Sequence, residues 1–242
     1  MGEKNITTES SAAGDPCTDR DAPVTPSHAD EAVILVHGLW TPATVFLPHA
    51  HWLKQQGYAV RRFAYPSVRA TLSDNAQALE RFLAMIEAPA IHFVGHSLGG
   101  LIILEMLAEL ADPRLRRVVL LGTPCLDSHC ARRLAALAGM PALLGRSIME
   151  SLSRARFATI TPRSPVEIGV LAGTRSIGLG RVVLDLPRPN DGVVTLDETR
   201  LPGAADFIAL PLAHSEMLAS RRCAAQIIAF LESGRFLHEP TP

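Results

Sequence analysis

The chain has 242 residues, a net charge of −1 and 48% hydrophobic residues. This length allows one domain with a substantial core, and the near-neutral charge argues against nucleic acid as a partner. All apolar runs fall short of the roughly 18 residues that a transmembrane helix needs, so we expect no membrane-spanning segment.

Residues 1–30 differ in composition from the rest of the chain. They contain no Leu, Phe, Tyr or Trp, and six acidic residues against two basic ones give them a charge of −4. A segment so poor in large apolar side chains buries too little surface to offset its conformational entropy, so we expect a disordered tail. It also lacks the apolar region and basic start of a secretory signal peptide. We therefore expect a folded domain at residues 31–236 and a cytoplasmic location.

Strands and helices are predicted to alternate along this domain, from short β-branched runs and longer helical periodicities respectively. In chain order we expect a strand at 32–36, a helix at 43–56, a strand at 58–65, a helix at 71–87, a strand at 90–94, a helix at 98–110, strands at 117–121, 166–172 and 207–210, and a helix at 216–233. Thr71 or Ser73 should cap the second helix, with Asp74 in its first turn. The alternation predicts an α/β fold with a mostly parallel, doubly wound sheet.

The segment at 124–165 is longer than an ordinary connection in such a sheet. It is rich in Ala, Leu and Met, and residues 128–165 carry six arginines against one acid. We favour a helical cap over the carboxyl edge of the sheet, where substrates enter such folds. The alternative is an ordinary pair of helices packed on the sheet.

In the cap hypothesis, apolar side chains of the segment form the wall of an acyl-chain site, because small-molecule pockets have mostly apolar walls. The arginines would then face solvent or meet an anionic head group or lipid surface. The alternative is that the leucines pack on the sheet and the arginines are merely solvated. The apolar candidates are Leu134, Leu137, Met140, Leu143 and Leu144.

The pentapeptide at residues 95–99, Gly-His-Ser-Leu-Gly, lies between a predicted strand and an apolar helix. A sharp strand-to-helix turn strains the backbone of its serine and leaves the hydroxyl exposed at the carboxyl end of the strand. Glycine is needed two residues before and after the serine, because a Cβ there would collide with the strand or helix. Ser97 is therefore predicted to be a nucleophile; the alternative is a Gly-Ser turn without chemistry.

A serine nucleophile needs a base, and three histidines follow Ser97 in the chain. His129 lies in the expected cap and His238 lies beyond the last helix. His214 comes directly after the last expected strand, so its loop emerges at the same edge of the sheet as Ser97. We assign His214 as the general base.

The base needs an acid that orients it, on a loop between the nucleophile and the histidine. Asp191 lies in the tight turn Arg-Pro-Asn-Asp-Gly-Val-Val at 188–194, which would hold a carboxylate rigidly. Asp191 is our first assignment and Asp185 the second. Asp206 is a further late candidate, whereas Asp197 and Glu198 resemble the solvated start of a short helix.

Two backbone N–H groups should bind the oxyanion that forms during acyl transfer. One belongs to Leu98, which follows the nucleophile at a helix N-terminus. The other should come from the loop after the first strand, where Leu39 is the expected donor. Trp40 and His96, which are adjacent to these groups, are assigned to the substrate pocket. The alternative for residues 37–38 is a plain turn that ends a strand.

The spacing of the cysteines fits neither a zinc site nor a dense disulfide framework. A bridge between Cys125 and Cys130 is one interpretation, and free thiols in a reducing compartment are the one we favour. The other two cysteines are Cys17 and Cys223.

Four segments together resemble the small serine lipases and esterases of the α/β-hydrolase superfamily: VHGLW at 36–40, GHSLGG at 95–100, NDGVV at 190–194 and LAHSEML at 212–218. The resemblance covers about residues 31–235. The Gly-Thr-Pro turn at 122–124 also recurs in lipase-like members, including relatives of the GPI inositol-deacylases.

This resemblance implies hydrolysis of a carboxylic ester, small or lipid-like, through an acyl-enzyme and without a metal or organic cofactor. It implies Ser97 as nucleophile, Asp191 as acid and His214 as base, with Leu39 and Leu98 as oxyanion donors. The chain is shorter than larger lipases, which favours an intracellular esterase.

Thioesterases, acyltransferases and peptidases use the same kind of serine site, so the sequence leaves these reactions open. A catalytically silent protein that binds a ligand in the same pocket is the alternative from another class.

Overall fold

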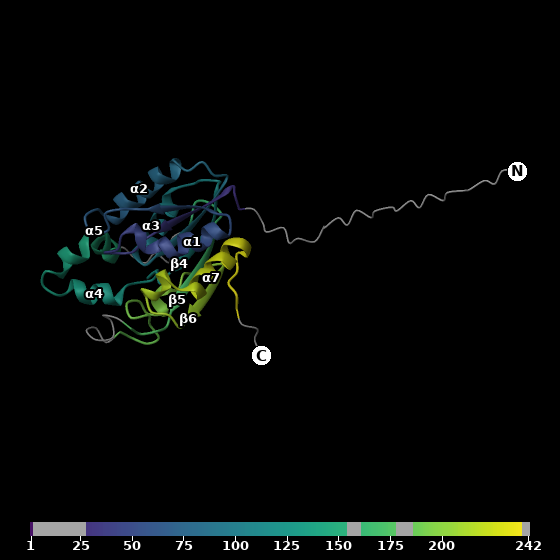
Figure 1. Ribbon diagram of the computed structural model, residues 1–242. Helices are drawn as coiled ribbons and strands as arrows, with labels where there is room; N and C mark the ends of the chain where they lie inside the picture. Colours follow the sequence, from purple (N-terminus) through teal and green to yellow (C-terminus); the bar gives the residue numbers. More distant parts are fainter. Residues whose placement is uncertain (2–27, 154–160, 178–185, 239–242) are drawn as a thin grey trace.

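The computed structural model describes residues 1, 28–153, 161–177 and 186–238. At its centre is a parallel six-stranded sheet with the strand order β2-β1-β3-β4-β5-β6 (Figure 1). The strands are β1 (Glu31–Val36), β2 (Ala59–Phe63), β3 (Ala90–His96), β4 (Leu115–Leu121), β5 (Glu167–Gly173) and β6 (Asp206–Leu210). The expected doubly wound parallel sheet is therefore confirmed.

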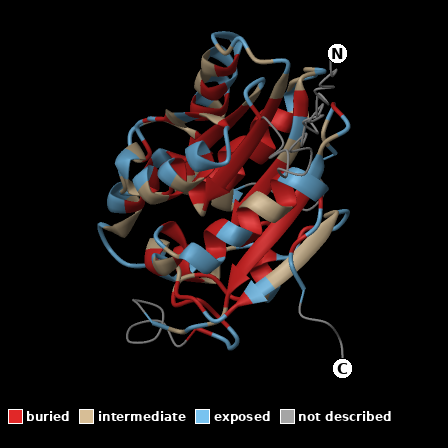
Figure 2. Cartoon of the chain, turned by 45° about the vertical axis from the view of Figure 1, so that its right-hand side comes forward, coloured by how far each residue is buried: buried red, intermediate tan, exposed pale blue. Residues whose placement is uncertain are grey.

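Helices cover both faces of the sheet. They are η1 (Ala43–Phe46), α1 (Leu47–Gln55), α2 (Leu72–Ala84), α3 (Leu98–Glu109), α4 (His129–Ala135), α5 (Met140–Ser153), η3 (Asp197–Thr199), η4 (Glu216–Leu218) and α7 (Arg221–Ser233). Helices α2 and α3 pack on one face, against alternate strand residues such as Ile34 and Phe93, and α1 and α7 pack on the other, against Leu35 and Val94. The four inner strands β1, β3, β4 and β5 are mostly buried between these layers, whereas the edge strands β2 and β6 are partly exposed (Figure 2).

Side-chain caps explain where two helices begin. Thr71 caps α2, and its hydroxyl accepts a hydrogen bond from the N–H of Asp74 while the Asp74 carboxylate accepts one from the N–H of Thr71. Of the two expected caps, Thr71 is therefore the one used. The helix expected at 216–233 is divided, because the Ser220 side chain caps α7 after the short helix η4.

The expected disordered tail falls almost entirely on residues 2–27, which lie outside the described residues. His28 is already part of the domain, because it is buried and its ring stacks on Tyr58 at a centroid distance of 4.1 Å. No helix among the described residues is long and apolar enough to cross a membrane.

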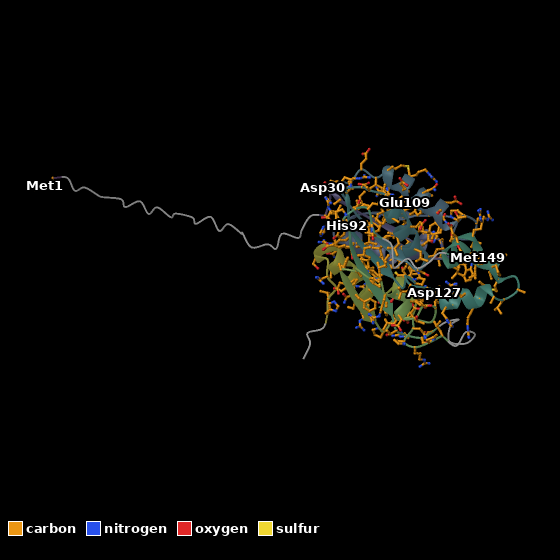
Figure 3. All side chains as sticks on the ribbon, turned by 180° about the vertical axis from the view of Figure 1, so that it is seen from behind. Met1, Asp30, His92, Glu109, Asp127 and Met149 are labelled. Atoms are coloured by element: carbon orange, nitrogen blue, oxygen red, sulfur yellow. The ribbon has the colours of Figure 1, made fainter. Side chains whose placement is uncertain are left out.

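Helices α4 and α5 lie together at one end of the molecule, opposite the end where His92 and Asp30 lie (Figures 1 and 3). Helix α5 is broken at Gly145, whose φ of 80° and ψ of 174° are not helical. After the break the helix is fixed to the body of the domain: Asn75 donates to the Ser147 hydroxyl, and the Arg146 N–H donates to the Val68 carbonyl at 2.9 Å. This half of α5 packs on α2, whereas the alternative considered from the sequence placed both helices on the sheet.

Helix α4 and the first half of α5 form a separate small cluster around Cys130, Leu134 and Leu144. These residues also line a cavity that contains Ser97. Ile148, Ser151 and Leu152 line the cavity from the second half of α5, so both helices of the segment, hereafter called the cap, border it. Of this segment, residues 154–160 lie outside the described part of the chain.

Candidate active site

Ser97 occupies the sharp turn between β3 and α3 with a φ of 54° and a ψ of −121°. A positive φ is rare for a residue with a side chain and stores strain at the turn. A Cβ at Gly95 would lie 2.7 Å from the Gly100 Cα, and one at Gly99 would lie 2.2 Å from the Val36 carbonyl oxygen. Both positions therefore require glycine, for the steric reason predicted from the sequence.

Asp191 and His214 form a close pair at the carboxyl edge of the same sheet. His214 Nδ1 lies 2.7 Å from Asp191 Oδ2. The other carboxylate oxygen accepts hydrogen bonds from the N–H groups of Val193 at 2.9 Å and Val194 at 2.8 Å. Asp191 is 1% exposed, and its carbonyl accepts the His214 N–H at 2.9 Å. The carboxylate is thus fixed by backbone groups on one side and by the imidazole on the other.

This pair fixes the protonation pattern of the His214 ring. A carboxylate only accepts hydrogen bonds, so Nδ1 carries the hydrogen and neutral His214 keeps an unprotonated Nε2. His214 and Ser97 both line one cavity. Within the described part of the chain, no hydrogen bond joins the Ser97 hydroxyl to His214. Such contacts are often long before substrate binds and tighten in the reacting complex.

His96, expected in the substrate pocket, lines the same cavity and also contacts the candidate base. Its Nε2 lies 3.0 Å from the His214 carbonyl oxygen, and the two rings have a centroid distance of 4.5 Å. Burial, and secondly the positive charge that His214 can carry, hold the pKa of His96 well below its usual range. His96 therefore stays neutral and donates a hydrogen bond from Nε2 to the His214 carbonyl. The spacing of the two histidines in the sequence did not predict this contact.

The loop after β1 holds the expected oxyanion donor Leu39. Tyr65 donates to the His37 carbonyl at 2.6 Å, and the Gly38 carbonyl accepts from His37 Nδ1 at 2.9 Å and from the Thr41 hydroxyl at 3.1 Å. Both carbonyls of the loop therefore have hydrogen-bond donors within the domain. Within the described residues, neither the N–H of Leu39 nor that of Leu98 has an acceptor. Both residues line the cavity beside Ser97, so their N–H groups are available to a ligand.

The cavity has a volume of about 810 Å³ and mostly apolar walls. Helix α3 contributes Leu98 and Leu101, and the cap contributes Leu134, Leu144 and Ile148. At its border Arg132 is paired with Asp127 at 2.6 Å, so this arginine is not a free cation. A cavity of this size and polarity suits a small molecule with an apolar chain.

Three of the five leucine and methionine positions expected in the cavity wall, Leu137, Met140 and Leu143, are not among the residues that line the cavity. Leu137 and Leu143 are 50% and 54% exposed, whereas the neighbouring Leu144 is 2% exposed. Met140 packs against the small cap cluster. The expectation was wrong for Leu137 and Leu143 because the chain turns at residues 136–139 and again at Gly145, which leaves both side chains outside.

The other acids and histidines considered from the sequence lie elsewhere or play other parts. Asp185 falls outside the described residues. Asp206 pairs with His238 at 2.9 Å. Asp197 is exposed, but Glu198 is buried, which corrects its expected place on a solvated surface. Its carboxylate accepts the N–H of Thr195 at 2.7 Å and the N–H of His129, and so fixes the start of α4.

Three cysteines lie in the described part of the chain, Cys125, Cys130 and Cys223, and all are buried free thiols without the considered bridge. Burial raises the pKa of Cys125 to about 12 and that of Cys130 to about 11, so both stay protonated and weakly nucleophilic. The described residues contain no group of three or more His, Cys, Asp or Glu side chains placed to hold a metal ion.

Several solved structures have a fold similar to that of this chain. A Bacillus licheniformis lipase in mature form has 19% identity and a TM-score of 0.61, over 86% of this chain and 93% of the lipase. A metagenomic carboxyl esterase has 22% identity and a TM-score of 0.60, over 84% and 70%. The enol-lactonase of Burkholderia xenovorans LB400 has 16% identity and a TM-score of 0.60, over 84% and 92%. Identities this low establish the shared fold alone.

No curated protein matches the sequence. The sequence does match the model of the Alpha/beta hydrolase family over residues 33–239, which is most of the chain. The parallel sheet, the strained serine turn and this match lead to one conclusion: the chain belongs to the alpha/beta hydrolase family.

Proposed function

We propose that this hydrolase is a serine esterase that cleaves carboxylic esters with Ser97, His214 and Asp191. The observation that carries the proposal is the buried Asp191–His214 pair, at 2.7 Å, in one cavity with a serine held at positive φ. A carboxylate that orients an imidazole beside an exposed serine is the arrangement that activates a hydroxyl for acyl transfer.

In the proposed reaction, the Ser97 oxygen attacks the ester carbonyl carbon while its proton passes to His214 Nε2. The Asp191 carboxylate stabilises the imidazolium that forms. The N–H groups of Leu39 and Leu98 bind the negative oxygen of the tetrahedral intermediate. When this intermediate collapses, the alcohol leaves with the proton from His214, and an acyl-serine remains.

Water then completes the cycle. His214 removes a proton from a water molecule, whose oxygen attacks the acyl carbon, and the second tetrahedral intermediate releases the acid and restores the Ser97 hydroxyl. No metal or organic cofactor takes part in the proposed sequence. The mostly apolar cavity supports an ester with an apolar acyl group as substrate, and the similar structures are described as a lipase, a carboxyl esterase and an enol-lactonase.

The proposal also includes a cytoplasmic location for the protein and contact between its cap and a lipid surface. A cytoplasmic location is supported by the three buried free thiols, since reducing compartments keep cysteines unpaired. Contact with an anionic lipid surface is supported by exposed apolar and basic side chains on the cap. These side chains are Leu137, Leu143, Met149 and Arg146.

Labelling with a fluorophosphonate, followed by mass spectrometry of the labelled peptide, tests the proposal. The wild type should be labelled at Ser97 and should hydrolyse 4-nitrophenyl esters. Ser97→Ala should lose the label and at least about a thousandfold in turnover. The cavity also contains Ser151, so Ser151→Ala is the matched control and should still be labelled.

Each outcome of this test has a meaning. A wild type that is neither labelled nor active would identify a silent ligand-binding protein. Labelling of Ser97 with thioester cleavage or acyl transfer in place of ester hydrolysis would favour the alternative reactions of the same site.

A further inference from the structure

The side chain of Trp40 bridges the loop after β1 and the cap. Its indole Nε1 donates a hydrogen bond of 2.9 Å to the Leu143 carbonyl, across 103 positions of sequence. Trp40 is also 49% exposed, so filling the core does not explain its place. Its φ of 57° is unusual for a large side chain and requires support from the surroundings.

The acceptor of this bond is available because α5 is broken at Gly145. Where a helix stops, the carbonyls of its last turn lose their helical N–H partners and need others. The Leu143 carbonyl belongs to that last turn, and the Trp40 indole provides the missing donor. The hydrogen bond between Trp40 and Leu143 therefore depends on the break of α5 at Gly145.

Besides this bond, the cap contacts the loop side through Leu39, which packs against the cluster of Cys130, Leu134 and Leu144. After the break, α5 is fixed by bonds from Arg146 and Ser147 to Val68 and Ala70. The start of α4 is fixed at Glu198. Between these two points the chain is exposed around residues 136–139, and a Cβ at Gly139 would have no atom within 4 Å.

On the loop side, Trp40 directly follows Leu39, whose N–H is the expected oxyanion donor. The Trp40 N–H donates to the Ser67 hydroxyl at a long 3.3 Å, so the backbone of Trp40 is held loosely there. A shift of the indole would move the backbone of Trp40, and the peptide bond between Leu39 and Trp40 would transmit this movement to Leu39. Donors of an oxyanion hole must be placed within a few tenths of an ångström to act.

We propose that Trp40 is a positioning residue whose hydrogen bond to the Leu143 carbonyl couples the cap to the oxyanion loop. The Leu143 carbonyl of the cap fixes the position of the Trp40 indole, and Trp40 in turn fixes the position of the Leu39 N–H during turnover. This inference rests on the proposed esterase function and adds a dependence of that function on the cap.

The first test is Trp40→Phe, which keeps an aromatic ring and removes the N–H. With 4-nitrophenyl acetate, whose acyl group is too short to use the apolar wall, kcat should fall about three- to tenfold, the equivalent of one hydrogen bond. KM should stay within about twofold. A change in KM alone would overturn the proposal, because it would make Trp40 merely a wall of the pocket.

The second test approaches the bond from the cap. A Cβ in Gly145→Ala would lie 2.4 Å from the Val68 carbonyl oxygen and should displace the segment that carries Leu143. Gly139→Ala is the matched control, because Gly139 has a similar φ of 78° and open space around it. Gly145→Ala should lower kcat as Trp40→Phe does, and Gly139→Ala should leave kcat unchanged. An equal fall in kcat for the two glycine variants would show that backbone strain alone is the cause, and this result would overturn the coupling.

The double variant Trp40→Phe/Gly145→Ala closes a thermodynamic cycle. If both changes act through one bond, the fall in kcat should be much smaller than the product of the single effects. Multiplicative effects would contradict the proposal. Thermal melts of all variants identify losses that come from unfolding.

Fluorescence gives a readout that does not depend on activity. The protein has two tryptophans, so Trp52→Phe leaves Trp40 as the only one. In this background Gly145→Ala should shift the Trp40 emission to longer wavelength, and Gly139→Ala should leave it unchanged. An unchanged emission in both would overturn the coupling. If the wild type hydrolyses no ester, the proposed function fails, and this emission still decides whether cap and loop are coupled.

Discussion

The imidazole of His96 donates a hydrogen bond of 3.0 Å to the backbone carbonyl of His214, which lies 118 positions later in the chain. This bond joins the residue that precedes the candidate nucleophile to the candidate base. The two loops of the site are therefore held together by a side chain that takes no part in the proposed proton transfer.

Removal of this donor should lower turnover without changing the reacting groups. His96→Leu leaves a buried carbonyl without its partner and lets the His214 loop shift, so kcat should fall about tenfold. His96→Gln keeps an N–H at a similar distance along the side chain and should stay within about threefold of the wild type. Steady-state kinetics on one short ester measure both, and equal losses in the two variants would contradict a role for the hydrogen bond.

Asp191→Asn tests the acid assignment. The backbone N–H groups of Val193 and Val194 can still bind the amide oxygen, so the turn should fold. The amide nitrogen then faces His214 Nδ1 and favours the wrong tautomer, so kcat should fall by about a thousandfold or more. Asp197→Asn is the control, because its carboxylate is exposed and forms only a long pair with Arg200 at 3.5 Å. Near wild-type kinetics in Asp191→Asn would show that another acid orients His214.

Leu143 and Leu144 form a natural pair for testing the cavity wall. Leu144→Phe adds volume inside the cavity and should lower kcat/KM for a decanoyl ester about tenfold, with the acetyl ester changed less than about twofold. Leu143→Phe changes a side chain that is 54% exposed and should alter neither. A chain-length series of 4-nitrophenyl esters gives the measurement. If both esters respond equally to Leu144→Phe, the residue is not an acyl-chain wall.

Acid should destabilise the fold through His49. Burial lowers the pKa of His49 to about 4, against a hydrogen bond to the Met217 carbonyl that raises it. Below the ordinary histidine pKa of about 6.5, His49 takes up a proton in the unfolded chain but stays neutral in the folded chain. The stability from this group is therefore full above that pH and falls as the pH approaches 4. The loss for this single group is about 3 kcal/mol.

The variant His49→Gln keeps a donor for Met217 and cannot become an imidazolium. Its free energy of unfolding should therefore decline less than that of the wild type between about pH 6.5 and 4.5. Part of the decline should remain, because burial also lowers the pKa of His37, His92 and His96. Urea titrations at several pH values measure the free energy of unfolding of both proteins. An equal decline in the wild type and in His49→Gln would show that His49 does not cause the acid destabilisation.

The sequence predicts most of the features that depend on neighbours in the chain. The serine turn requires Gly95 and Gly99 for local steric reasons, and Thr71 caps α2 through a residue three positions away. The parallel sheet follows from the alternation of strands and helices. These signals act over a few residues, so the pattern of residues is sufficient to detect them.

Features that depend on distant segments were not predictable in this way. Leu143 and Leu144 are adjacent and chemically identical, yet one is exposed and the other buried because α5 breaks at Gly145. Glu198 is buried because the start of α4 provides a hydrogen-bond donor. His96 contacts His214 only after the sheet has formed. Each case depends on a partner whose position the chain order does not reveal.

The register of β1 and β3 has a consequence for engineering the protein. Val36 pairs with Gly95, so β1 and β3 end within one residue of each other, and the loops that carry the Leu39 and Leu98 amides begin at the same edge of the sheet. Side-chain exchanges at 39 or 98 leave those amides in place, whereas one inserted residue in the loop at 37–39 would move them. Reporter domains are better inserted at Gly139, where a Cβ would have no atom within 4 Å and the chain belongs to neither of these two loops.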